Sequence, residues 1–429
     1  MTVYKEMPKS VRDFMNEIAE LCGEEHKGWS EIFENVYSNT LLTTIKRISE
    51  DDTYVLTGDI PAMWLRDSTA QVRPYLPIAE RDADIQAMIR GVISRQFDMI
   101  LHDPYANAFN EEANGAGHQT DDTTMTPLIW ERKYEIDSLC YPIQLSYLYY
   151  QHTQDATIFD DRFKQVAQTV IDLWVVEQDH TQSPYNFERP TDRKEDTLTN
   201  GGRGGEVART GMTWSGFRPS DDACEYNYLV PSNMFAVVVL EYMETIFTTI
   251  NVDAHLANQA QQLKFEIKKG IEDFAVFSNG EKDIYAYEVD GLGNALLIDD
   301  PNVPSLLAAP YLGFCDVDDV LYQNTRDHIL SPKNKYFYEG QFARGCGSSH
   351  TPEGYIWPIA LSIEGLTTND KDAKAAILNT LVATDGGTKM MHESFDVNNP
   401  TNFTREWFSW ANMMFCELVM DFFDIKVKR

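Results

Sequence analysis

The chain has 429 residues, of which 43% are hydrophobic, and its 36 Lys and Arg against 67 Asp and Glu give a formal net charge of −31 at pH 7. This hydrophobic content is enough for a large core and excludes an intrinsically disordered chain. The negative charge repels phosphate backbones and anionic lipids, which argues against nucleic acid or a membrane surface as a partner. The negative charge is compatible with a neutral substrate.

The cysteines and the chain start indicate the cellular compartment. The cysteines are scattered at positions 22, 140, 224, 315, 346 and 416, and no two have the spacing of a zinc or redox motif. We therefore expect reduced, mostly buried thiols. Residues 1–14 lack the apolar core of a signal peptide, and the longest apolar run, 234–240, is much shorter than the roughly 20 residues that cross a bilayer. These features predict a cytoplasmic protein.

Residues 57–69, TGDIPAMWLRDST, combine a turn with the start of a helix. Glycine frees the backbone of such a turn, and proline fixes it. The ring of Trp64 can stack on a pyranose ring, and Asp59, Arg66 and Asp67 can bond neighbouring hydroxyl groups. The alternative is a capped helix with a surface ion pair, and the pattern by itself does not choose between the two.

Similar clusters of polar and aromatic residues recur along the chain, each in front of an apolar stretch with helical spacing. They lie at residues 58–68, 130–138, 214–226, 299–305, 350–358 and 391–410. Six such helix starts predict six helical hairpins around an axis, with the polar clusters gathered at one end. Strands and helices do not alternate regularly, which argues against a parallel α/β sheet.

The remaining elements follow from periodicity and composition. Helices are expected within 236–247, 265–274 and 407–423, and a short strand pattern at 282–289. A long loop is expected at 181–209, whose GGRGG run lacks the Lys-Ser/Thr pair of a phosphate-binding loop. Long loops in compact domains are often functional, and the Gly-rich part near 201–209 is expected to form a pocket wall. Because no Ser/Pro/Gly linker divides the chain, we expect one domain over residues 1–429.

Two acidic sites stand in aromatic surroundings and fit glycoside hydrolysis. One is the pair Asp221 and Asp222, and the other is Glu393. The reaction needs a protonated carboxylic acid that donates to the leaving oxygen, and an ionised carboxylate that activates water or attacks the sugar. Each site also has a simpler explanation. Asp221, after Ser220, would be an acidic residue in the first turn of a helix, and Glu393 would belong to a surface ion pair.

The patterns do not fit a metal site. The segment that begins at His392 and Glu393 lacks the second histidine of HExxH, and residues 316–319 lack the glycine and distal glutamate of an EF-hand. No metal or other cofactor is therefore expected. His350 and Asn302 fit either core positions or bonds to sugar hydroxyl groups.

The chain resembles glycoside hydrolase family 125, bacterial exo-α-1,6-mannosidases, over nearly its whole length. The resemblance rests on long and unusual strings. They are TGDIPAMWLRDS (57–68), DPYANAFN (103–110), WERKYEIDSLCYP (130–142), GMTWSGFRPSDDACEY (211–226), NVPSLL (302–307), YQNTR (322–326) and MHESF (391–395).

This resemblance implies an all-α fold, an (α/α)6 barrel with minor β-strands in its loops. It also implies an inverting, metal-independent enzyme that removes terminal α-1,6-linked mannose from manno-oligosaccharides or N-glycan fragments. By the family pattern, Asp221 is the general acid, with Asp222 as the alternative, and Glu393 is the general base. The family commonly has MHEGF where this chain has Ser394, a difference that could narrow the space around the attacking water.

The residues expected to hold the sugar share a place in the clusters and a polar or aromatic side chain. They are Asp59, Trp64, Arg66, Asp67, Glu131, Asp137, Trp214, Arg218, Asp222, Asn302, His350 and Arg405. Three alternatives stay open: a metal-dependent mannosidase, a sugar-binding module without activity, and a helical-barrel enzyme that acts on another sugar or by phosphorolysis.

Overall fold

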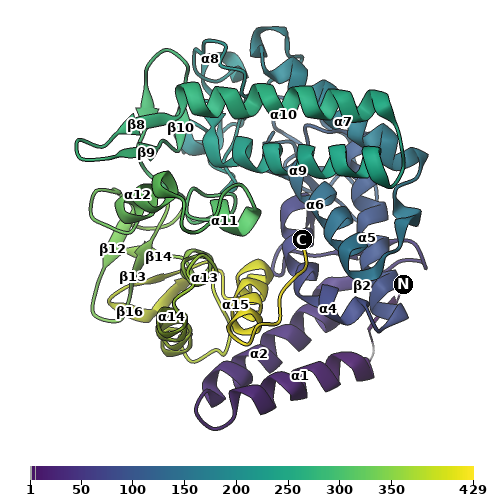
Figure 1. Ribbon diagram of the computed structural model, residues 1–429, viewed down its shortest axis with the longest axis vertical. Helices are drawn as coiled ribbons and strands as arrows, with labels where there is room; N and C mark the ends of the chain where they lie inside the picture. Colours follow the sequence, from purple (N-terminus) through teal and green to yellow (C-terminus); the bar gives the residue numbers. More distant parts are fainter. Residues whose placement is uncertain (1, 5) are drawn as a thin grey trace. The chain divides into compact units, whose positions relative to one another are not determined.

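The computed structural model describes residues 2–4 and 6–429, and the chain is mainly helical with short antiparallel strands (Figure 1). It divides into two compact units, each made of several chain segments. The first unit contains residues up to 95, 145–155 and 337–429, and the second contains 96–144 and 156–336. The single domain expected from the sequence stays a prediction.

The first unit combines helices from both ends of the chain with short strands. Its helices are α1 (Lys9–Cys22), α2 (Lys27–Asn39), α3 (Leu65–Val72), α4 (Leu76–Ala79), α13 (Pro358–Leu366), α14 (Lys371–Ala383) and α15 (Ser409–Phe422), with parts of α5 (Ala83–His102) and α6 (Ile136–Thr153). Its strands are β1 (Thr2–Val3), β2 (Ile45–Arg47), β3 (Thr53–Val55), β4 (Met63–Trp64), β12 (Phe337–Glu339), β13 (Arg344–Cys346), β14 (Tyr355–Ile356), β15 (Ser394–Asp396) and β16 (Asn399–Thr404). The antiparallel ladders run β1-β2-β3, β12-β13 and β14-β15-β16.

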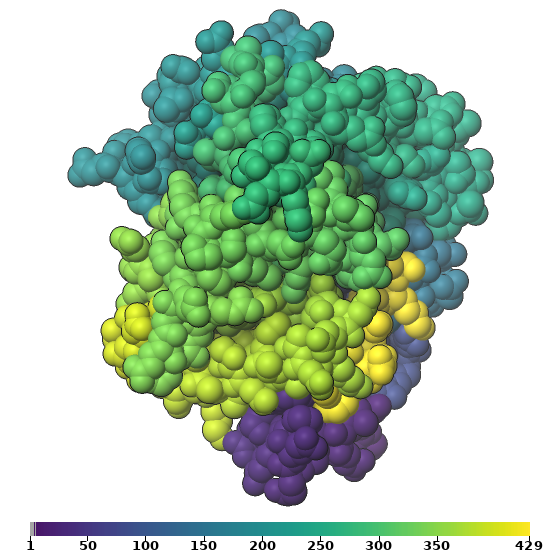
Figure 2. Space-filling model, turned by 60° about the vertical axis from the view of Figure 1, so that its left-hand side comes forward, coloured from purple at the N-terminus to yellow at the C-terminus, as the bar shows by residue number. Residues whose placement is uncertain are grey.

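Helix α15 lies at the centre of the first unit. Residues 409–420 of this helix are all buried. The helix contacts α2, α3, α13 and α14, so that nearly every face meets another element. Figure 2 shows the purple N-terminal helices beside yellow segments near the C-terminus. An all-round apolar sequence is typical of such a buried helix, and the helix expected within 407–423 is confirmed.

The second unit is built around long helices. Its helices are α7 (Asp161–Glu177), α9 (Val230–Thr249), α10 (Ala254–Phe274), α11 (Ala309–Leu312) and α12 (Val320–Ile329), with the remaining parts of α5 and α6. Its strands are β5 (Ala108–Phe109), β6 (Ile129–Glu131), β7 (Tyr228–Leu229), β8 (Val276–Ser278), β9 (Asp283–Tyr285), β10 (Glu288–Val289) and β11 (Ala295–Leu296). The ladders β5-β6, β8-β9 and β7-β10-β11 are antiparallel.

Helices α9 and α10 run side by side (Figure 1). Residues 230–240 of α9 are buried on every face, whereas α10 buries one stripe and exposes the other. The side chain of Asp253 caps α10 by accepting bonds from the next turn's backbone N–H groups. The helices expected within 236–247 and 265–274 are confirmed, and the strand pattern at 282–289 divides into β9 and β10.

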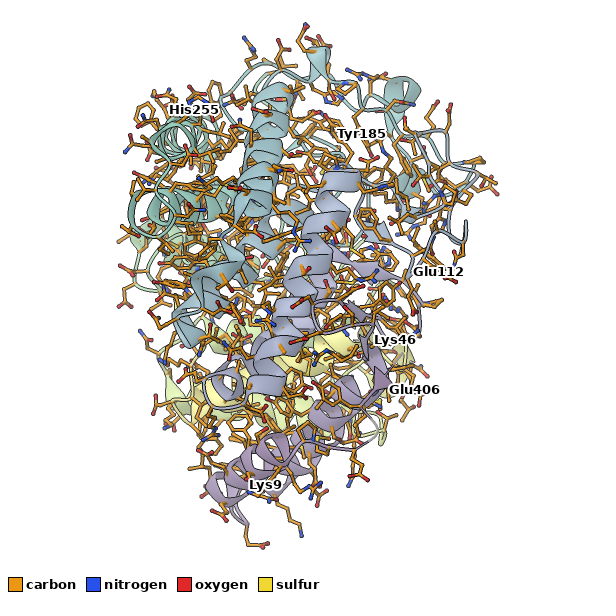
Figure 3. The ribbon with its side chains drawn as sticks, turned by 90° about the vertical axis from the view of Figure 1, so that its right-hand side faces the viewer. Lys9, Lys46, Glu112, Tyr185, His255 and Glu406 are labelled. Atoms are coloured by element: carbon orange, nitrogen blue, oxygen red, sulfur yellow. The ribbon has the colours of Figure 1, made fainter. Side chains whose placement is uncertain are left out.

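The loop expected at 181–209 is confirmed in the main. It contains only short turns, and the segment Thr199–Gly202 (α8) has left-handed residues at Asn200 and Gly201, so it is not a regular helix. Tyr185, labelled in Figure 3, is fully buried at the start of this loop and stacks on Tyr105. An aromatic anchor thus holds one end of a long irregular segment.

All six clusters lie in front of a helix, as predicted. The helices that follow them are α3, α6, α9, α11, α13 and α15. The six cysteines all lie within the described residues and form no disulfide, and five are buried while Cys315 is partly exposed, which confirms the expected burial. Across residues 2–4 and 6–429, none of the helices combines the length and the apolar character needed to cross a membrane. The gathering of the clusters at one end stays a prediction.

Candidate functional site

Asp221 lies in a tight turn of the second unit. Two backbone bonds close the turn: the amide of Arg218 donates to the carbonyl of Asp222 at 2.8 Å, and the amide of Asp221 donates to the carbonyl of Arg218 at 2.9 Å. Asp221 has a φ of 67°, in the left-handed region that few residues other than glycine adopt. Helix α9 begins only at Val230, so the explanation of Asp221 as a first-turn acid is wrong.

The two neighbouring aspartates have different partners. Asp222 is fully buried, and its carboxylate accepts a bond from the Arg193 guanidinium at 2.9 Å. Asp221 is partly exposed, and its backbone carbonyl accepts a bond from Lys133 Nζ at 2.6 Å. Asp221 is therefore the more exposed residue of the pair.

Arg218, the first residue of this turn, forms a buried ion pair. Its Nε lies 2.5 Å from Glu288 Oε1, and both residues are buried. The other oxygen of Glu288 accepts the backbone N–H groups of Glu225 and Tyr226, each at 2.9 Å. Burial alone would lower the pKa of Arg218, but the charge and hydrogen bond of Glu288 raise it well above its usual value. This ion pair gives Arg218 a structural role that needs no ligand.

Three further predicted residues of the second unit are also buried. Glu131 accepts a bond from Arg189 at 2.8 Å, and Asp137 lies in α6 with no exposed surface. Trp214 is fully buried, with its ring centre 3.6 Å from that of His180 in a stacked arrangement. This packing places Trp214 in the core, where its ring is covered and not open to a sugar.

The cluster at 299–305 is ordered by its own aspartates. The backbone N–H and the side-chain amide of Asn302 both donate to Asp300 Oδ1, at 3.1 and 2.9 Å. Asp299 accepts the backbone N–H groups of Leu306 and Leu307 at 2.8 and 3.0 Å. Asn302 is thus held in one orientation, on a segment that Asp299 connects to the start of the next helix.

The burial of Asp299 predicts a pH-dependent stability. Burial raises the pKa of Asp299 from 3.8 to about 8. A carboxyl group whose pKa is raised by folding stabilises the fold fully below its unfolded pKa, and this contribution is lost as the pH rises through the folded pKa. Between about pH 5 and about pH 8, the Tm of the wild type should therefore fall relative to that of Asp299→Asn. The expected slope is up to about 1.4 kcal/mol of unfolding free energy per pH unit. Calorimetry at several pH values measures the Tm of both proteins. A constant difference in Tm between the wild type and Asp299→Asn over this range would contradict the prediction.

The first unit brings the first and last clusters together. Gly58 forms a backbone bridge with Phe408, and the amide of Ser409 donates to the carbonyl of Thr57 at 3.3 Å. Gly58 has a φ of 127°, and a Cβ atom at this position would lie 2.7 Å from the carbonyl oxygen of Trp407. The glycine is needed because the two chain segments approach too closely for a side chain.

Arg405 joins Asp59 to Glu393 within this unit. Its Nε and Nη2 donate to Asp59 Oδ1 at 3.1 and 2.5 Å, and its Nη1 lies 3.6 Å from Glu393 Oε1. Burial alone would lower the pKa of Arg405, but the two carboxylates raise it above its usual value. Glu393 is only 6% exposed, so its explanation as part of an ordinary surface ion pair is wrong.

The helix start at Trp64 is buried as well. Arg66 and Asp67 are 3% and 4% exposed, and Arg66 Nε lies 3.4 Å from Asp67 Oδ2. The guanidinium carbon of Arg66 lies 5.3 Å from the ring centre of Trp410, a cation–π distance. Trp64 is the N-cap residue of α3 and makes no side-chain cap bond. A capped helix with a surface ion pair is therefore the wrong explanation of this segment.

His350 and Ser394 complete the predicted set in the first unit. His350 is half-buried, with its ring centre 6.2 Å from that of Trp357. Ser394 is fully buried in β15, and its hydroxyl lies 2.6 Å from the hydroxyl of Thr404 in β16. This contact directs the serine hydroxyl to its strand partner and gives no support to a narrowing around an attacking water.

The sequence reasoning missed Lys133 and Arg193. Lys133 lies inside the cluster at 130–138, but its partner Asp221 is 88 residues away along the chain. Arg193 lies in the long loop, 29 residues before its partner Asp222. Among residues 2–4 and 6–429, no group of three or more His, Cys, Asp or Glu side chains is placed to hold a metal ion.

Comparisons with known proteins cover almost the whole chain. Residues 26–420 match the family described as metal-independent alpha-mannosidase (GH125). The meiotically up-regulated gene 157 protein of Schizosaccharomyces pombe is 37% identical over 444 residues, which are 97% of this chain and 86% of that protein.

Solved structures are similar too. A Streptococcus pneumoniae structure, described as a metal-independent alpha mannosidase in a non-productive complex with α-1,6-mannobiose, is 56% identical. Its TM-score is 0.97, and the match covers 99% of this chain and 100% of that chain. A wild-type glycosidase structure has a TM-score of 0.58 at 12% identity, covering 96% of this chain and 98% of that chain, a likeness of fold alone. The predicted all-α fold class with minor strands is confirmed, and these matches are consistent with the (α/α)6 barrel.

Proposed function

The chain belongs to the GH125 family of metal-independent α-mannosidases, and from this membership we propose that it is an exo-acting α-1,6-mannosidase. It removes the terminal non-reducing mannose from α-1,6-linked oligosaccharides and inverts the anomeric configuration. The observation that carries the proposal is the 56% identity, over 99% of the chain, to a structure whose complex contains α-1,6-mannobiose.

Asp221 is proposed as the general acid. It is the more exposed residue of the aspartate pair, whereas the carboxylate of Asp222 is buried against Arg193. A general acid must reach the glycosidic oxygen, so a side chain that is buried in an ion pair is the poorer candidate. In the proposed reaction, Asp221 gives its proton to the leaving oxygen as the bond to the anomeric carbon breaks.

Glu393 is proposed as the general base. It takes a proton from the water that attacks the anomeric carbon on the face opposite to the leaving group. The Arg405 guanidinium holds the Glu393 carboxylate, and Asp59 in turn holds Arg405 through two nitrogens. A base oriented in this way needs little rearrangement when the water attacks.

The remaining predicted residues are proposed to hold the substrate or to support those that do. Trp64, Arg66 and Asp67 lie at the start of α3, and His350 lies in the segment before β14. Arg405 and Asp59 support Glu393. The residues proposed from the second unit are Glu131, Asp137, Arg218, Asp222 and Asn302. Buried polar groups held in one orientation discriminate hydroxyl positions, because a misplaced hydroxyl leaves the group that should bind it without a hydrogen bond.

The proposed setting is the cytoplasm, and the proposed substrates are manno-oligosaccharides or N-glycan fragments. Six cysteines outside any disulfide, five of them buried, support a reducing compartment. The net charge of −31 supports a neutral substrate such as an oligosaccharide. No metal or other cofactor is required in the proposed reaction.

Proton NMR of a fresh α-1,6-mannobiose digest tests the proposal. We expect mannose to appear first as the β anomer, with an unchanged rate in the presence of a chelator and without added phosphate. Initial appearance of the α anomer would contradict inversion. Loss of activity in the chelator would point to a metal-dependent enzyme, and a phosphate requirement would point to phosphorolysis. Binding of mannobiose without any release of mannose would indicate a sugar-binding module.

A further inference from the structure

Lys133 is a buried lysine with an unusual set of partners. It is 2% exposed, and its ammonium donates to the backbone carbonyl of Asp221 at 2.6 Å. The carboxylates of Asp196 and Glu131 lie 3.4 and 4.0 Å from the ammonium, and the ring centre of Phe217 lies 5.1 Å away. Burial of a charge is costly unless the charge is paired and hydrogen-bonded, so these contacts all help to keep Lys133 in place.

The residue that Lys133 contacts is conformationally strained. An aspartate with a φ of 67° is in the left-handed region, which costs free energy for a residue with a Cβ atom, although less for aspartate and asparagine than for most others. Such a conformation persists only where surrounding contacts hold it, and strained residues gather at functional sites. The hydrogen bond from Lys133 goes to the backbone carbonyl of this same residue, so it can stabilise the left-handed conformation directly.

A second support comes from the loop at 193–196. The Arg193 guanidinium donates to the Asp222 carboxylate at 2.9 Å, and the amide of Ala223 donates to the carbonyl of Glu195 at 2.7 Å. Lys133 links this loop to the turn, because its ammonium lies near Asp196 as well as bonding the Asp221 carbonyl. The turn is therefore held by Lys133 and by the loop at 193–196, and Lys133 also contacts this loop.

We propose that Lys133 is a positioning residue that holds the turn at 217–223 in the shape that presents the Asp221 carboxyl group for proton donation. The inference rests on the proposed function, in which Asp221 is the general acid. Lys133 donates to the backbone of Asp221 and takes no part in the proton transfer. Without its ammonium, the backbone of Asp221 relaxes out of the left-handed region and the carboxyl group moves from its place.

The test is Lys133→Met, which keeps an unbranched stem against Phe217 and removes the charge. The matched control is Lys194→Met, since the Lys194 side chain is 91% exposed and 3.8 Å from Glu195. Each variant is assayed on α-1,6-mannobiose, whose leaving group needs a proton, and on 2,4-dinitrophenyl α-mannoside, whose leaving group does not. Lys133→Arg, which retains a charged donor, serves as the conservative rescue.

For Lys133→Met we expect kcat on mannobiose to fall about 10- to 100-fold, with KM nearly unchanged. A general acid contributes roughly 10²- to 10⁴-fold to the rate, and a misplaced acid should lose only a part of this contribution. On the dinitrophenyl substrate the loss should be less than about threefold. Lys133→Arg should recover part of the mannobiose rate, and Lys194→Met should match the wild type. Equal losses on both substrates, or no loss on either, would overturn the positioning role.

A crystal structure of Lys133→Met provides a readout that is independent of activity. We expect φ of Asp221 to leave the left-handed region, and an unchanged φ would overturn the inference. If the wild type releases no mannose at all, the proposed function fails, while this structural readout still decides the role of Lys133. If Lys133→Met does not fold, Lys133→Gln takes its place in both experiments, with the same outcomes expected.

Discussion

Glu393→Gln should hydrolyse α-1,6-mannobiose about 10²- to 10⁴-fold more slowly than the wild type, while it binds mannosides with nearly the same affinity. The glutamine side chain has the same shape and keeps an oxygen that faces Arg405. Its amide cannot accept the proton that the attacking water must lose. Initial rates from mannose release measure the first quantity, and titration calorimetry with mannobiose measures the second.

The matched control for this substitution is Glu406→Gln. Glu406 is an exposed glutamate thirteen positions further along the chain, and it is labelled in Figure 3. The control should keep wild-type turnover, because it removes the same charge from a side chain that faces solvent. Near-normal turnover in Glu393→Gln would contradict the general base. Loss of both binding and turnover would instead assign Glu393 to holding the sugar.

Asp221→Asn should show a loss that depends on the leaving group. On α-1,6-mannobiose the rate should fall about 10²- to 10⁴-fold, because the amide cannot donate the proton that the leaving oxygen needs. On 2,4-dinitrophenyl α-mannoside the rate should be close to that of the wild type. Asparagine suits this test because, like aspartate, it adopts the left-handed conformation more readily than most residues with a Cβ atom, so the φ of 67° should be retained.

Asp222→Asn separates the two aspartates. This substitution weakens the ion pair between the buried Asp222 and the partly exposed Arg193, so it should lower the Tm and slow the hydrolysis of both substrates to a similar extent. Kinetic assays on the two substrates, with calorimetry for the Tm, make the comparison. Leaving-group dependence in Asp222→Asn and its absence in Asp221→Asn would exchange the roles of the two residues.

Two of the simpler explanations of the sequence were overturned by burial. The pair Arg66 and Asp67 fits a surface ion pair by spacing, yet both residues are at most 4% exposed. Glu393 fits a surface pair as well, yet it lies 6% exposed beside Arg405. Spacing along a helix or turn gives the local neighbours of a side chain, and it carries no information on the segments that cover them from elsewhere in the chain.

Trp214 shows a different effect of tertiary packing. An aromatic residue among acidic residues is a reasonable candidate for stacking on a sugar, but Trp214 stacks on His180 inside the core. Aromatic residues pack in cores and also bind ligands, so the residue type alone does not distinguish the two roles. Only the identity of the ring's neighbour, 34 positions away along the chain, decides between them.

By itself the sequence determined the helical class, the start of a helix behind each of the six clusters, the absence of disulfides and the family. These are local or cumulative properties: hydrophobic periodicity, turn residues and long identical strings are all readable along the chain. Only the tertiary structure decided how the catalytic candidates are held. The bond from Lys133 to Asp221 and the ion pair of Arg405 with Asp59 join residues 88 and 346 positions apart. Such contacts depend on the path of the whole chain, and so does the strain at Asp221, because contacts from distant segments must hold a conformation that the residue alone disfavours.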